Sequence, residues 1–143
     1  MRPSDLLSEP LVRYALKQAW LDSHPGVFGA HEEGGFVVRE ASGGLNVVRW
    51  PQGEQNTIVL PPHRDCRIPL GAIVASFHTH PNTGYDFLQE PSETDTRAIR
   101  DDPDLKGSDY AGEWVITEQI LYLISPAGEV SEVADSQELF STT

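Results

Sequence analysis

The segment AIVASFHTHP at residues 72–81 constrains the fold of this chain more than any other segment. It is a mostly apolar run of strand length, which is typical of a central strand buried on both faces. Pro81 ends the run, because proline has no backbone N–H to donate to a neighbouring strand. Side chains two residues apart in a strand point to the same face, so His78 and His80 are predicted to project together at the strand's exposed carboxyl end.

The remaining segments predict an α+β architecture. Apolar spacing over residues 8–24 predicts a helix with Ser8 as its N-cap and His24 in the turn that ends it. Short β-branched runs at 35–40, 45–50 and 56–60 predict an antiparallel meander, and residues 113–117 and 120–125 predict a closing pair of strands. The tail, residues 135–143, is interpreted as a short helix or a frayed end.

We therefore expect a single α+β domain over residues 1–143. Its central sheet is expected to be mostly antiparallel or mixed, with about six strands. At least two helices should flank this sheet.

Charge and cysteine content exclude several kinds of function. The chain has 10 basic and 22 acidic residues and a net charge of -12, which argues against binding to nucleic-acid phosphates or to an anionic membrane. Its single cysteine, Cys66, excludes an internal disulfide and is interpreted as a core residue, so a metal site would have to use histidines and carboxylates. Without an apolar leader or a run long enough to span a membrane, the expected location is cytoplasmic.

The segment SETDTRAIRDD at residues 92–102 predicts a helix with acidic residues in its first turn. Residues three apart are neighbours on a helix, so Ser92 and Asp95 should lie on the same side. Each half of the pattern is ambiguous alone, because Ser-x-x-Asp is a common capping pattern and His-x-His is common on protein surfaces. Combined with Pro81 and Pro91, the two halves favour a metal site.

This combination of HTHP (78–81) and SETD (92–95) resembles the motif of the JAMM family of zinc metallopeptidases, also called the MPN or JAB fold, which is cytidine-deaminase-like. The family places a glutamate before a strand as Glu-x-x-Gly, which EEGGFV fits if Glu32 is that residue; Glu33 is the alternative. The resemblance covers residues 32–95 directly and the whole chain in element order. The segment between His80 and Ser92 is longer than in the family, so residues 82–90 are predicted to form an enlarged loop.

The resemblance implies one Zn²⁺ per chain, held by His78, His80 and Asp95, with an open position for water. Glu32 would be the general base, and Ser92 would donate a hydrogen bond to the developing oxyanion. The implied reaction is hydrolysis of amide or isopeptide bonds, often after the tail of a ubiquitin-like protein. A small peptide or amide substrate fits the sequence equally well.

In the enlarged loop, Tyr85, Phe87 and Leu88 would either form a wall of the substrate groove or pack the loop down. His31 and His63 are interpreted as loop or surface residues.

Other kinds of protein fit less well. A non-catalytic JAMM-like scaffold would generally have lost ligands, whereas this chain retains every motif residue. Cupins also use His-x-His on a strand, but they need a glutamate where this chain has Thr83 and Gly84. A chain of 143 residues is too short for an amidohydrolase barrel.

Overall fold

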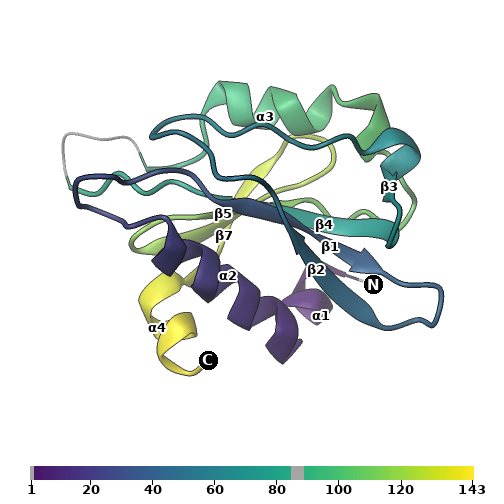
Figure 1. Ribbon diagram of the computed structural model, residues 1–143, viewed down its shortest axis with the longest axis horizontal. Helices are drawn as coiled ribbons and strands as arrows, with labels where there is room; N and C mark the ends of the chain where they lie inside the picture. Colours follow the sequence, from purple (N-terminus) through teal and green to yellow (C-terminus); the bar gives the residue numbers. More distant parts are fainter. Residues whose placement is uncertain (1, 85–88) are drawn as a thin grey trace.

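The computed structural model describes residues 2–84 and 89–143, and within them a mixed seven-stranded sheet runs through the molecule (Figure 1). The strand order is β2-β1-β4-β5-β6-β7, with the short β3 beside β4. Every pair is antiparallel except β4 and β5, which are parallel. The strands are β1 (Gly34–Arg39), β2 (Leu45–Arg49), β3 (Arg67–Ile68), β4 (Gly71–Thr79), β5 (Glu113–Ile116), β6 (Ile120–Ile124) and β7 (Val130–Asp135).

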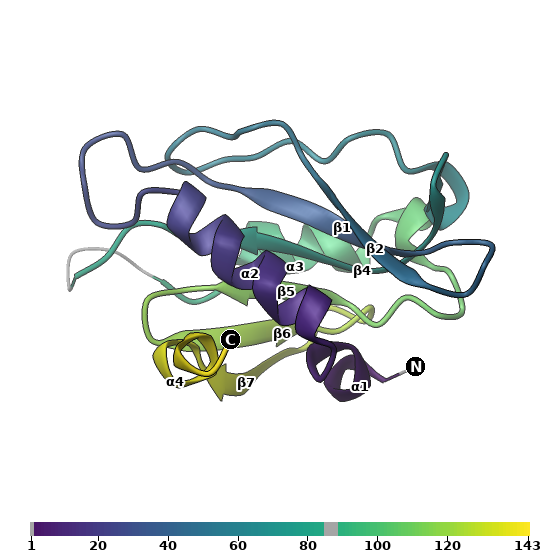
Figure 2. The same ribbon diagram turned by 60° about the horizontal axis from the view of Figure 1, so that its bottom comes forward.

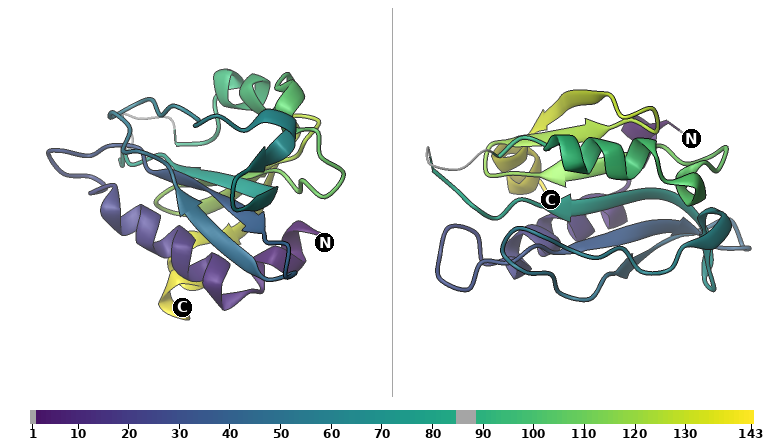
Figure 3. Two further views of the ribbon diagram at one scale, coloured as in Figure 1. Left: turned by 45° about the vertical axis from the view of Figure 1, so that its right-hand side comes forward. Right: turned by 90° about the horizontal axis from the view of Figure 1, so that it is seen from above.

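Helices cover both faces of this sheet (Figures 1 and 2). One face is covered by α1 (Pro3–Leu7), α2 (Pro10–Asp22) and α4 (Ser136–Ser141). The other face carries α3 (Glu93–Arg100), which belongs to the connection between the parallel strands β4 and β5, as Figure 3 shows. Two 3₁₀ turns, η1 (Arg64–Cys66) and η2 (Pro103–Leu105), complete the described elements. The expected α+β class is confirmed, with seven strands in place of about six.

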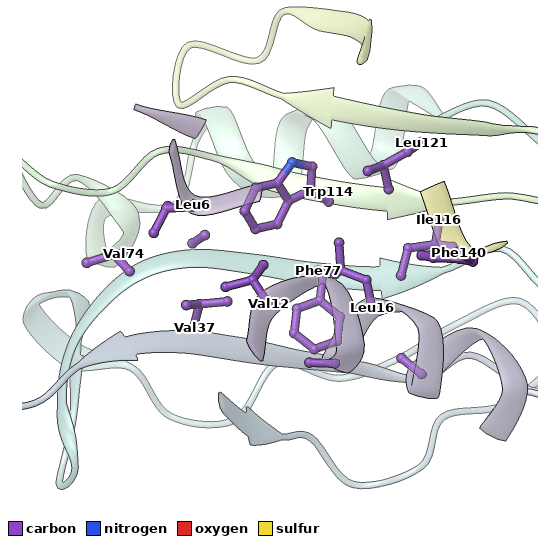
Figure 4. Packing of buried hydrophobic residues seen from close by; sticks show 13 residues of the cluster. Leu6, Val12, Leu16, Val37, Val74, Phe77, Trp114, Ile116, Leu121 and Phe140 are labelled. Atoms are coloured by element: carbon purple, nitrogen blue, oxygen red, sulfur yellow. The ribbon is translucent and has the colours of Figure 1, made fainter. Parts of the chain in front are cut away.

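Two apolar clusters lie on opposite faces of the sheet. Under α2, Phe77 of β4 and Trp114 of β5 pack against Val12 and Leu16 (Figure 4). On the α3 side, Ile99 of the helix packs with Phe36, Ile73 and Val115 of the strands. Since Phe77 faces α2, its neighbours Ser76 and His78 face α3, and so does His80. The sheet thus presents the predicted histidines to the helix that carries Asp95.

The predicted N-terminal helix corresponds to α2, and the short helix α1 precedes it outside the predicted range. Ser8 is the C-cap of α1 and not an N-cap, and α2 begins at Pro10 with Glu9 as its N-cap. Proline favours the first position of a helix because its fixed φ suits that position and its missing N–H is not needed there. The helix therefore starts after Ser8 and not at it.

One predicted strand is absent, and the short β3 and β7 were not predicted. Residues 56–60 were predicted as a strand of the meander, but they form no strand, and Thr57 O instead accepts a hydrogen bond from Glu54 N in a tight turn (2.8 Å). β7 was not predicted, because its sequence VSEVAD is largely polar and exposed. The tail does form the short helix α4. Among the described residues, no helix combines the length and apolar character needed to cross a membrane.

Candidate metal centre

The carboxyl end of β4 holds the two histidines in a fixed strand conformation. Thr79 N donates to Glu33 O (2.9 Å) on one side, and His80 N donates to Ile116 O (2.8 Å) on the other. The chain then leaves the sheet at Pro81, as predicted from its missing N–H. His78 is buried and His80 is partly buried, so both imidazoles are set in place by backbone bonds on either side of the strand.

The first turn of α3 holds Asp95 opposite these histidines. Ser92 is the N-cap: its hydroxyl accepts a hydrogen bond from Asp95 N (3.1 Å), and Ser92 N donates to Asp95 Oδ2 (2.8 Å). This reciprocal pair is a capping box. The cap thereby fixes the carboxylate that the sequence predicts as the third ligand.

The structure brings His78, His80 and Asp95 together, with one ligand atom from each lying within 4.8 Å of the others. The two Nε2 atoms are 3.2 Å apart, His80 Nε2 is 3.2 Å from Asp95 Oδ2, and His78 Nε2 is 3.6 Å from Asp95 Oδ1. A tetrahedral zinc ion with bonds of 2.0–2.2 Å separates its ligand atoms by about 3.3 Å. These separations, and a donor set of two imidazoles and one carboxylate, fit a catalytic zinc site.

Both imidazoles are oriented by their other ring nitrogen. His78 Nδ1 donates to Glu113 Oε2 (2.7 Å), and His80 Nδ1 donates to the carbonyl oxygen of Gln89 (2.7 Å). With a hydrogen on each Nδ1, the Nε2 atoms of the neutral rings have lone pairs directed at the same point. Two such lone pairs 3.2 Å apart repel one another unless a cation lies between them.

At the centre, the carboxylates and the imidazoles stabilise each other's ionised forms. Burial alone would raise the pKa of Asp95, but hydrogen bonds from His78 and His80 hold the pKa of this carboxyl well below its usual range. Burial lowers the pKa of His78, but the carboxylates of Glu113 and Asp95 more than offset it and raise that pKa well above its usual value. Asp95 is therefore ionised at neutral pH. In a metal-free protein, a proton on His78 would occupy the place of the cation.

Glu32, and not Glu33, faces the centre. Gly34 pairs with His78, so Glu32, two residues earlier, shares the face of the histidines. Burial raises the pKa of Glu32, and the nearby His78 and His80 partly offset this effect. Glu33 points to the other face, where it accepts hydrogen bonds from His31 Nε2 and Arg49 Nη2, both at 2.6 Å.

The Glu-x-x-Gly spacing at the start of β1 has a packing reason. A Cβ atom at Gly35 would lie 2.6 Å from the ring of Phe77 and 2.9 Å from Val48 O. Only glycine lets the Phe77 ring lie against β1 at this point. Gly35 pairs with Phe77 next to the Gly34–His78 pair, so this packing lies beside the histidines at the end of β4.

A cleft of about 460 Å³ opens beside the centre. Glu32, Ser92, His80 and Asp95 all line it, so the predicted base, the predicted oxyanion donor and two of the predicted ligands share one space. The remaining lining residues are Gln55, Asn56, Pro81, Asn82, Glu90, Pro91 and Glu93. Tyr85, Phe87 and Leu88, predicted as a wall of the groove or as packing residues, lie outside the described residues.

Sequence reasoning missed the residues behind His78. Glu113 is buried, accepts a hydrogen bond from Ser76 Oγ (2.8 Å) and contacts His78, while Ser76 also bonds to Tyr110 OH (2.6 Å). The available signal was an acidic residue at the start of the otherwise apolar run EWVIT. The contact itself depends on the parallel register of β4 and β5, which the sequence does not reveal.

Two histidines predicted as loop or surface residues are more enclosed than expected. His31 is buried against Glu33, and His63 Nε2 lies 2.7 Å from Asp102 Oδ2. Each ring is held by a carboxylate, which explains why it can leave solvent. Cys66 is buried, as predicted.

Comparisons of the chain with protein-family models, with curated proteins and with solved structures found no match. The assignment of a function therefore depends on the chain's own residues and on the geometry of this centre.

Proposed function

We propose that this protein is a zinc-dependent hydrolase of amide or isopeptide bonds, with a JAMM-like fold. The observation that carries the proposal is the convergence of His78, His80 and Asp95 at a cleft that Glu32 and Ser92 also line. The mixed sheet and the position of α3 between β4 and β5 support the fold assignment. The metal would be a single Zn²⁺ per chain, and it would supply a Lewis acid that polarises the scissile carbonyl and lowers the pKa of water.

Glu32 is the proposed general acid and base. Its raised pKa, caused mainly by burial, brings the carboxylate closer to neutrality and makes it better able to hold a proton between two steps. It would take a proton from the attacking water and deliver it to the leaving amine. Glu33 is not proposed for this role, because both of its oxygens accept hydrogen bonds on the opposite face of the strand.

Ser92 is the proposed oxyanion donor. Its hydroxyl oxygen accepts the hydrogen bond of Asp95 N, which leaves the hydroxyl hydrogen available for a substrate oxygen in the cleft. The substrate is proposed to be a ubiquitin-like tail or a small peptide amide. The cleft is lined by acidic side chains, so an acidic substrate segment is disfavoured there. These side chains are Glu32, Glu90, Glu93 and Asp95.

The decisive experiment is turnover by zinc-loaded Glu32→Gln on a panel of ubiquitin-like fusions, isopeptide-linked conjugates and peptide amides. Loss of the proton carrier should reduce kcat by about 10²–10⁴-fold while zinc content stays that of wild type. Glu33→Gln is the matched control: it should lower stability, because the bonds to His31 and Arg49 weaken, and keep kcat. Equal turnover by Glu32→Gln and wild type would refute the mechanism, and zinc binding without cleavage of any substrate would favour the scaffold alternative.

A further inference from the structure

A buried chain of hydrogen bonds lies behind the candidate metal centre. It runs from Tyr110 OH to Ser76 Oγ (2.6 Å), from Ser76 Oγ to Glu113 Oε1 (2.8 Å), and from Glu113 Oε2 to His78 Nδ1 (2.7 Å). Ser76 is fully buried, and Glu113 and Tyr110 are 3% and 5% exposed. Tyr110, Ser76 and Glu113 do not line the cleft, so contact with substrate does not explain this network.

The buried carboxylate of Glu113 has a single ion-pair partner among the described residues, and that partner is His78. Burying a carboxylate without a cation costs free energy. The charge of Glu113 therefore favours a positive charge on the His78 ring or on an ion bound to that ring. A divalent ion on the Nε2 side would meet two carboxylates, Asp95 directly and Glu113 through the His78 ring. The negative charges of these two carboxylates then balance the charge of the divalent ion.

We infer that Glu113 is the positioning residue of the metal centre, with Ser76 and Tyr110 holding it in place; this inference rests on the proposed metal site. Glu113 accepts the hydrogen of His78 Nδ1 and so fixes the tautomer whose Nε2 lone pair faces His80 and Asp95. Ser76 occupies the second carboxylate oxygen and prevents rotation of the group. Glu113 is not a catalytic residue, because it reaches the reacting atoms only through His78.

The strand register explains how this arrangement is built. Ser76 pairs with Glu113 across the parallel β4–β5 ladder, and both side chains face α3, as His78 does. Glu113 therefore reaches Ser76 directly and His78 diagonally, two residues further along β4. Ser76 and His78 on β4 and Glu113 on β5 thus orient the imidazole before any metal binds.

The test compares Glu113→Gln with wild type by zinc dissociation constant, measured by competition with a chromophoric chelator, and by ¹⁵N NMR of the His78 ring. An amide can donate to Nδ1 as well as accept from it, so the unique tautomer should be lost and zinc affinity should fall about 10–100-fold. Ser76→Ala should cause a smaller loss, because it removes only the restraint on Glu113. Asp102→Asn is the matched control, since it alters another carboxylate–histidine pair at the same 2.7 Å separation and should leave zinc affinity unchanged.

The zinc affinities of wild type and the variants distinguish failure of the positioning role from failure of the proposed metal site. If wild type binds zinc and Glu113→Gln binds it equally well with the same His78 tautomer, the positioning role is overturned and the proposed function stands. If wild type itself binds no zinc, both proposals fail. Equal loss of affinity in Glu113→Gln and Asp102→Asn would show a general effect of destabilisation and would also overturn the positioning role.

Discussion

At the scale of single residues, the capping role of Ser92 and its proposed catalytic role use different atoms. Its oxygen lone pair caps α3 by accepting from Asp95 N, and its hydroxyl hydrogen is free to donate into the cleft. Its backbone N–H, which any residue would retain, holds the Asp95 carboxylate. Capping and catalysis are therefore compatible in this serine, and substitutions can separate them.

Ser92→Ala should keep zinc, because the backbone bond to Asp95 persists, but lose about 1 kcal/mol of stability with the cap. Its kcat should fall about 10²–10³-fold if the hydroxyl stabilises the oxyanion. Ser92→Gly separates the two effects, since glycine caps helices almost as well and has no hydroxyl. It should be close to wild type in chemical denaturation and as slow as Ser92→Ala in turnover. Recovery of kcat by Ser92→Gly would contradict the oxyanion role, and Ser92→Thr should retain both functions.

At the scale of elements, predictions succeeded where a pattern is local. β4 was predictable from its apolar run and Pro81, and the start of α3 from its capping pattern, because both signals lie within a few neighbouring residues. Residues 56–60 were mistaken for a strand because they are apolar and β-branched, yet the prolines around them and the turn at Glu54 keep them out of the sheet. β7 was missed for the converse reason, since its stability comes from pairing with β6 and not from its own side chains.

The residues of the candidate metal centre were likewise predictable where the pattern is local. His78, His80, Ser92 and Asp95 were found because each pair lies within one strand or one helical turn. The choice between Glu32 and Glu33 required the register of β1 against β4, and Glu113 required the register of β5 against β4. Register depends on how segments far apart in the chain pack together, so the local patterns used for prediction do not reveal it.

The turn that leads to η1 supplies a pH-dependent contact between elements. His63 is held by Pro61 O through Nδ1 and by Asp102, the N-cap of η2, through Nε2, both at 2.7 Å. Burial lowers the pKa of His63, but these two hydrogen bonds and the Asp102 charge more than offset it, so the net pKa lies above its usual value. The contact is thus strongest when His63 is protonated.

Because the folded pKa of His63 is raised, its contribution to stability is fully present below the unfolded value of about 6.5 and is lost as pH rises through the folded pKa. We expect Asp102→Asn to reduce the free energy of unfolding more at pH 5.5 than at pH 8.5. Asparagine retains an oxygen that accepts from Asp104 N, so this substitution keeps the cap of η2. Urea denaturation of both proteins at the two pH values measures the difference. A difference that is constant or grows with pH would contradict the sign.

At the scale of the whole molecule, the candidate metal centre lies where the two halves of the sheet meet α3. The antiparallel strands β2-β1-β4 and β5-β6-β7 meet only at the parallel β4–β5 pair, and α3 lies in the connection between those two strands. Within α3, Ile99 is the one buried residue. Asp95 is therefore a principal link between this helix and the end of β4, and a bound ion would strengthen that link.

Zinc should consequently raise the thermal stability of the whole protein. A ligand that binds only the folded state at a free concentration of 1,000 Kd adds about 4 kcal/mol to stability, so the Tm should rise with zinc and fall again with a chelator. His78→Ala combined with His80→Ala should remove both the shift and the single zinc found by elemental analysis. His24→Asn is the matched control, because His24 is an exposed histidine at φ 51°, a conformation that asparagine tolerates. An equal zinc-dependent shift in the double variant would place the ion elsewhere and overturn the site.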